Sequence, residues 1–198
     1  MLLHTCCATC LAGVIEQLKN THEVACYFYN PNIHPMEEYK RRLADVKKYC
    51  KKLGIPMIEG EYDKERWFKI TKGLETEPEG GQRCIKCYTM RLEETARFAC
   101  EVRSRDLTHP EKGRQGPLTL PSGYDIFGTT LTTSPHKKAE IINPIGVKLV
   151  KKYGIKFLEA DFKKRDGFKC ACETADRQGF YRQNYCGCIY SKTKIASA

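Results

Sequence analysis

The sequence lacks any stretch that would hold it in a membrane. No apolar run in its 198 residues approaches the roughly 18 residues that a spanning helix needs. Only five residues precede Cys6, which leaves no room for a signal peptide before the first cysteine group. We therefore expect a cytoplasmic protein with no membrane partner.

The sequence also lacks the common nucleotide-binding motifs. It contains no Walker A pattern, no G-x-G-x-x-G fingerprint and no Gly- and Ser-rich loop of the ATP pyrophosphatase kind. The segment CCATC (6–10) stands where such a loop would follow the first strand. We therefore expect that ATP is not used, and that metal ligands replace the phosphate-binding loop.

Acidic residues are fewer than basic ones. Lys and Arg number 34 against 24 Asp and Glu, so the formal net charge is +10. This excess fits a polyanionic partner, such as a nucleic-acid backbone along which dispersed basic clusters make contacts, and it fits a solvated Lys-rich surface equally. The clusters lie at 47–52, 97–105, 136–138, 151–152 and 163–165.

Strand and helix patterns alternate along what we expect to be a single domain over 1–198. Short apolar runs predict strands at 2–5, 23–29, 55–58, 124–129 and 155–158, and helical spacing predicts helices at 10–20, 36–53, 63–72, 83–103 and 139–153. The alternation predicts an α/β fold with a parallel sheet covered on both faces. Residues 104–123, rich in Pro and Gly, are predicted as a loop insertion. Residues 166–198 form a Cys- and Tyr-rich C-terminal segment that begins with a helix over 168–178 and completes the site.

The twelve cysteines do not indicate a disulfide framework, because thiols stay reduced in the cytoplasm and the chain is too long for a small domain held by disulfides. A C-x-x-C turn brings two thiolates onto one metal, and two such turns supply the four sulfurs of a zinc site or a [4Fe-4S] cluster. The spacing does not choose between zinc and iron–sulfur, but the long separation of the turns favours a functional centre over a structural one. The two turns are Cys7/Cys10 and Cys84/Cys87.

Three further thiols exceed what one cluster requires: Cys6, and Cys186 with Cys188 around a glycine that allows a tight turn. They would bind a second metal, act as a redox dithiol or only surround the first metal. Cys170 and Cys172 are left out, because side chains two apart on a helix face different directions. Cys26, Cys50 and Cys100 are expected to be buried apolar residues.

The carboxyl ends of parallel strands are where α/β proteins bind ligands. His4 ends the first predicted strand, and a buried structural role is its expected one. The segment TTLTTSPH (129–136) follows the fourth strand and precedes Lys137 and Lys138, which suits an anion. Asp161 follows the fifth strand, either as a hard metal ligand or proton carrier, or as a helix N-cap.

Five blocks of the chain, in order, resemble the QueH family of epoxyqueuosine reductases: LLHTCCATC, RCIKCYTMRLEETA, TTLTTSPHKK, LEADFKKRDGFK and YRQNYCGCIYS. The resemblance implies a fold similar to the HUP-type adenine nucleotide α-hydrolases. It also implies the last step of queuosine biosynthesis, the reduction of epoxyqueuosine to queuosine at the wobble position of tRNA, with an iron–sulfur cofactor and no cobalamin. The chain departs from the family at Thr9, where CCAPC is usual, and in the length of 104–123.

On this resemblance we expect a [4Fe-4S] cluster on Cys7, Cys10, Cys84 and Cys87, while Cys6, Cys186, Cys188 and Asp161 hold or flank a mononuclear iron. Tyr181, Tyr185 and Tyr190 surround the CGC motif and are candidates to stack on a base of the anticodon stem-loop, or are packed core residues. An electron donor is the other expected partner. The alternatives are an iron–sulfur-dependent tRNA thiolase, an RNA-binding module held by structural zinc, and a thiol oxidoreductase working through CIKC or CGC.

Overall fold

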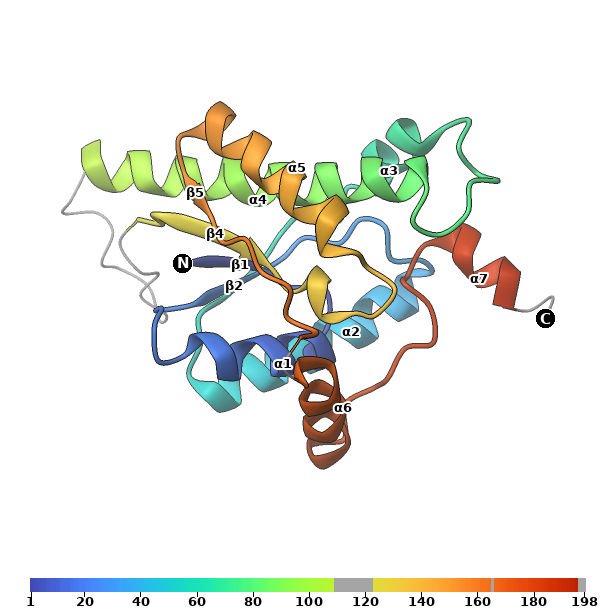
Figure 1. Ribbon diagram of the computed structural model, residues 1–198, viewed down its shortest axis with the longest axis horizontal. Helices are drawn as coiled ribbons and strands as arrows, with labels where there is room; N and C mark the ends of the chain where they lie inside the picture. Colours follow the sequence, from blue (N-terminus) through green and yellow to red (C-terminus); the bar gives the residue numbers. More distant parts are fainter. Residues whose placement is uncertain (109–122, 165, 196–198) are drawn as a thin grey trace.

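The computed structural model describes residues 1–108, 123–164 and 166–195 (Figure 1). Its centre is a five-stranded sheet in which every pair is parallel, in the order β3-β2-β1-β4-β5. This confirms the predicted α/β fold. The strands are β1 (Leu2–His4), β2 (Ala25–Phe28), β3 (Met57–Glu59), β4 (Ile126–Thr129) and β5 (Lys156–Phe157).

Helices cover both faces of the sheet. Figure 1 shows α4 and α5 on one face and α1, α2 and α6 on the other. Successive residues of β1 point to opposite faces, so Leu2 joins the core under α4 and α5, while Leu3 joins the core under α1 and α2. The helices are α1 (Ala8–Leu18), α2 (Met36–Leu53), α3 (Lys64–Thr71), α4 (Gln82–Thr108), α5 (Ala139–Tyr153), α6 (Gly167–Gln178) and α7 (Ile189–Ile195).

The direction in which strands are added changes at β1. The chain moves from β1 outward through β2 and β3, and then returns to the other side of β1 for β4 and β5. Ligand crevices of open α/β sheets lie at such a switch point, beyond the carboxyl ends of the strands. The loops after β1 and β4, which carry Cys6 and Thr130, meet there.

Several predicted boundaries agree with the structure. Helices α2 and α5 have the predicted bounds, and Gly54 and Gly154 end them with φ of 66° and 64°, which glycine adopts without strain. The loop predicted from 104 was wrong at its start, because α4 continues to Thr108; residues 109–122 lie outside the described part of the chain. Within the described ranges, no helix is both long and apolar enough to span a bilayer.

Replacing Gly13 by alanine is expected to lower the melting temperature by several degrees. Gly13 lies where α1 packs on α6, and an added Cβ would sit 2.7 Å from the Cβ of Ala171 and 2.9 Å from the carbonyl oxygen of Gly167. Overpacking costs about 1–3 kcal/mol, and each kcal/mol shifts Tm by about 2–4 °C in a domain of this size. Calorimetry of the variant measures this. The melting temperature of a Gly13→Ala/Ala171→Gly double variant should fall by less than the sum of the two single effects. Additive effects would contradict a direct contact between the two positions.

Candidate metal centre

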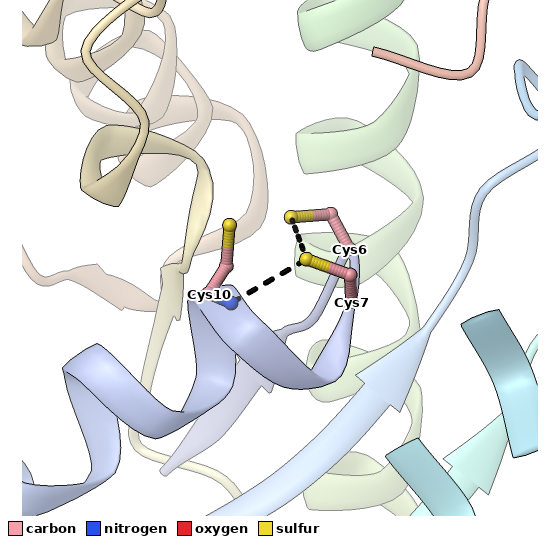
Figure 2. Close-up of side chains that lie close together, drawn as sticks. All are labelled: Cys6, Cys7 and Cys10. Atoms are coloured by element: carbon pink, nitrogen blue, oxygen red, sulfur yellow. Dashed lines mark hydrogen bonds between the residues drawn. The ribbon is translucent and has the colours of Figure 1, made fainter. Parts of the chain in front are cut away.

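Three thiols converge directly after β1. Cys7 is the N-cap of α1, with an extended backbone, and its Sγ accepts a hydrogen bond from the Cys10 amide at 3.4 Å. The sulfurs of Cys6, Cys7 and Cys10 lie within 4.8 Å of one another, and all three residues are buried (Figure 2). The loop after β4 supports them, because Thr130 Oγ1 accepts from the Cys6 amide at 3.2 Å. This buried triad can hold a metal ion.

Four more thiols lie around a small adjoining cavity of about 20 Å³. Cys84 and Cys87 come from the first turns of α4, and Cys186 and Cys188 come from the loop before α7. Gly187 between the latter two has φ of 101°, and a Cβ there would lie 2.8 Å from the Ile33 side chain. Only glycine fits this position without strain, as the sequence predicts for a tight turn.

A larger cavity of about 510 Å³ opens beside both groups of thiols. Cys6 and Cys10 line it from the triad, and Cys186 lines both cavities. Its volume is in the range of small-molecule pockets, which is about 300–1,000 Å³. Polar and aromatic side chains complete its wall, among them Arg42, Glu79, Ser134, His136, Phe168, Arg182, Gln183 and Tyr185.

Two buried arginines next to the thiols have no acidic partner among the residues that the structure describes. Arg91 is 2% exposed and donates to Asn30 Oδ1 at 2.6 Å and to His4 Nε2 at 3.3 Å. Arg83 is 1% exposed and donates to main-chain carbonyls of the 74–77 segment. Both line the two cavities. A buried cation without an opposite charge is costly, so these guanidinium groups indicate negative charge on the thiols beside them.

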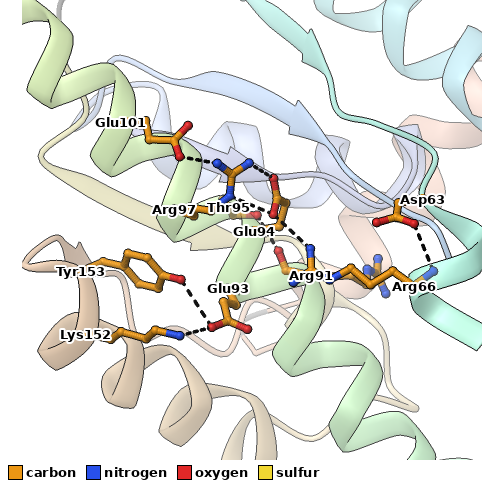
Figure 3. A network of polar contacts seen from close by, with 10 residues as sticks. All are labelled: Asp63, Arg66, Arg91, Glu93, Glu94, Thr95, Arg97, Glu101, Lys152 and Tyr153. Atoms are coloured by element: carbon orange, nitrogen blue, oxygen red, sulfur yellow. Dashed lines mark hydrogen bonds and ion pairs between the residues drawn. The ribbon is translucent and has the colours of Figure 1, made fainter. Parts of the chain in front are cut away.

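The acidic residues Glu93 and Glu94 that follow Arg91 on α4 pair with other basic residues. Figure 3 shows the Glu94 carboxylate between Arg97 and Arg66, at 3.3 Å from Arg66 Nη1. On the same helix Glu93 pairs with Lys152 and Tyr153 of α5 (Figure 3). These pairs fix the position of α4. Because the two carboxylates are paired elsewhere, the positive charge of Arg91 acts on the thiols that line the same cavities.

The thiol pKa values show how charge is divided within each group. Hydrogen bonds from Cys10 and Cys7 lower the pKa of Cys6 well below its usual range, against the effect of burial. A hydrogen bond from Cys188 does the same for the pKa of Cys186. Burial lowers the pKa of Lys137, but the thiolates of Cys6 and Cys186 outweigh burial and the net pKa is raised.

Each group of thiols therefore holds one thiolate readily and resists forming a second. Desolvation is the main cause that raises the pKa of Cys84 and of Cys87. A bound metal overcomes this resistance, because a cation draws protons off the remaining thiols. Seven converging sulfurs, with buried cations around them, are a donor set that fits a thiolate-bound metal or an iron–sulfur cluster.

Comparison with known proteins agrees with this donor set. A family model described as "Epoxyqueuosine reductase QueH" matches residues 1–109 and 118–194. The chain belongs to the QueH family. Proteins named epoxyqueuosine reductase QueH from Staphylococcus epidermidis and Haemophilus influenzae are 38% and 37% identical; the matches cover 98% and 96% of this chain and 76% and 71% of theirs. The one from Thermotoga maritima is 34% identical over 96% of this chain and 89% of its own length.

The C-terminal block YRQNYCGCIYS is held beside the other QueH blocks by hydrogen bonds to α2. Arg42 pairs with Glu38 at 2.6 Å and also donates to the carbonyl oxygens of Tyr185 at 3.0 Å and Cys186 at 3.3 Å. The His34 amide donates to the Gly187 carbonyl at 2.8 Å. These contacts hold the CGC loop against the rest of the site.

Asp161 is placed differently from the cysteines. Its carboxylate lies 2.6 Å from Lys163 Nζ, and it is not among the described residues that line either cavity. The metal-ligand role of Asp161 therefore stays a prediction.

His4 has the structural role expected of it, fully buried and 2.9 Å from Thr129 Oγ1. Burial and Arg91 lower the pKa of His4 to about 3, so the ring is neutral.

Of the three tyrosines near the CGC motif, only Tyr185 lines the larger cavity. Tyr181 donates to Glu38 at 3.0 Å and lies under Arg41, while Tyr190 stacks on Trp67. Both are packed against protein side chains. Cys26 and Cys50 are buried as expected, and Cys100 is half-buried.

Several residues of the site were missed by sequence reasoning, the buried Arg83 among them. Cys172 was left out of the site with Cys170, but it lines the larger cavity, and Arg182 donates to its sulfur at 3.5 Å; Cys170 is exposed. Arg42 and Arg91 look like ordinary charged positions of amphipathic helices, since nothing local marks a buried arginine. Gln183 stands inside the YRQNYCGC block and had no pattern of its own.

Proposed function

We propose that this protein reduces epoxyqueuosine to queuosine in tRNA. The observation that carries the proposal is the convergence of seven thiols beside a 510 Å³ cavity, with two buried arginines that have no acidic partner among the described residues, in a chain of the QueH family. Removing the epoxide oxygen as water consumes two electrons and two protons, so an external electron donor is part of the proposal. The reaction belongs in the cytoplasm, where thiols stay reduced.

The ligand set we propose is the one that the sequence indicates. Cys7, Cys10, Cys84 and Cys87 hold a [4Fe-4S] cluster, and Cys6, Cys186, Cys188 and Asp161 hold or flank a mononuclear iron. When bound, the cluster supplies electrons one at a time and the iron supplies a Lewis acid. The arrangement of sulfurs as a triad and a quartet supports a shared centre, since Cys186 belongs to both cavities.

The chain's own side chains bind and orient the substrate. The cavity has the size for one modified nucleoside extruded from an anticodon loop. The Tyr185 ring lines its wall, and its hydroxyl donates to the His34 carbonyl, so the ring is fixed for stacking. Ser134, His136 and Lys137 line the same cavity and supply hydrogen-bond donors and positive charge for a backbone phosphate.

Anaerobically purified protein is expected to contain about four acid-labile sulfides and at least four irons per chain. With dithionite it should convert the epoxyqueuosine of an anticodon stem-loop to queuosine without ATP. Metal and sulfide analysis and nucleoside chromatography measure the two results. Zinc without sulfide would contradict the reductase and favour an RNA-binding module, and an ATP requirement would favour a thiolase.

A further inference from the structure

Gln183 reaches the thiol triad from the C-terminal segment. Its Nε2 donates to Cys7 Sγ at 3.0 Å, and the side chain lines the larger cavity. The two residues are 176 positions apart in sequence. The contact therefore exists only when the segment before the CGC loop is folded onto the start of α1.

This hydrogen bond to sulfur is not a by-product of other contacts of the amide. Gln183 Oε1 is buried and has no hydrogen-bond partner among the described residues. An unsatisfied buried carbonyl is unfavourable, so the amide keeps its place through the bond from Nε2 to Cys7. Main-chain amides also donate to these thiols, Cys10 to Cys7 and Gly80 to Cys84. Gln183 is thus a side-chain donor that substitution can remove without altering the backbone.

The charge of a ligating sulfur increases when a cluster accepts an electron. A donor hydrogen bond to that sulfur stabilises the reduced form more than the oxidised form, and hydrogen bonds to sulfur are among the factors that set cluster potentials. We propose that Gln183 is a positioning residue that holds Cys7 and raises the reduction potential of the cluster. The inference rests on the proposed function, because it takes Cys7 as a cluster ligand.

The test is a redox titration of iron-loaded protein, followed by electron paramagnetic resonance, for wild type and Gln183→Leu. Leucine keeps most of the side-chain volume and removes the donor. We expect iron and sulfide content to be retained and the reduction equilibrium to shift about tenfold toward the oxidised form, which is about 59 mV for one electron. Gln178→Leu makes the same change at the end of α6, where the amide oxygen accepts from the exposed Lys52, and should leave the potential unchanged.

If Gln183→Leu loses its cluster, two further variants test whether Gln183 raises the reduction potential. Gln183→Lys keeps a donor and should hold the potential at or above the wild-type value, whereas Gln183→Glu replaces the donor by a negative charge and should lower it. A wild-type potential in Gln183→Leu, or equal potentials in the Lys and Glu variants, would overturn this inference and leave the reductase proposal standing. Zinc without sulfide in the wild-type protein would overturn both.

Discussion

Arg42→Met is expected to release the C-terminal segment and to lower the iron content of the protein. The change removes one buried guanidinium that pairs with Glu38 and holds the carbonyl oxygens of Tyr185 and Cys186. Breaking a buried ion pair costs about 3–5 kcal/mol, because the remaining carboxylate has lost its cationic partner. Cys186 and Cys188 would then no longer be held beside Cys84 and Cys87. Iron per chain and the melting temperature of metal-free protein measure the two effects.

The neighbouring residue provides the control for this prediction. Arg41 is exposed and stacks over the Tyr181 ring at 3.6 Å, and the hydrogen bonds to the Tyr185 and Cys186 carbonyls come from Arg42. Arg41→Met should therefore lose less than about 1 kcal/mol, the usual value for an exposed cation–π pair, and keep its iron. The iron content and melting temperature of Arg42→Lys should lie between those of wild type and Arg42→Met, because one ammonium group cannot reproduce the planar, multidentate contacts of the guanidinium. Wild-type iron content in Arg42→Met would show that the tail is held by other contacts.

Cys10→Ala and Cys84→Ala are each expected to remove the same cluster. The two thiols lie on α1 and α4, and the proposed centre requires both. Loss of either should reduce metal affinity by more than the roughly 10–100-fold that follows loss of an outer hydrogen-bond partner. Visible absorption, iron and sulfide per chain, and conversion of epoxyqueuosine should all fall together.

The double variant and an exposed cysteine make this prediction specific. If both thiols hold one centre, the double variant Cys10→Ala/Cys84→Ala should lose no more iron and activity than either single variant. The effects of residues that act as a unit are not additive. Cys170→Ala changes an exposed thiol on α6 and should leave the iron content unchanged. A cluster that survives Cys84→Ala but not Cys10→Ala would assign it to the N-terminal triad without α4.

Local patterns were sufficient for the main elements of the fold. The apolar spacing of α2 and α5 set their bounds, and the glycine after each helix fixed its end, because both signals depend on residues within one or two turns. The same reasoning failed at 104–108, where helix continues after the periodicity weakens. It also gave no sign of α7 or of the buried state of Arg83 and Arg91, since burial is decided by elements far away in the chain.

The sequence by itself determined which residue types the centre has and where along the chain they stand. Cysteine spacing, the missing phosphate loop and the CGC motif are chemical properties of short segments, and they indicated a thiol-bound metal. The resemblance to the QueH family came from five ordered blocks of the chain. Only the tertiary structure decided which thiols meet. The parallel sheet turns back at β1 and brings the loops after β1 and β4 together, and Arg42 fastens the C-terminal segment beside α4. Tertiary packing also supplied Arg91, Cys172 and Gln183, because their contacts with the site join segments that no local pattern connects.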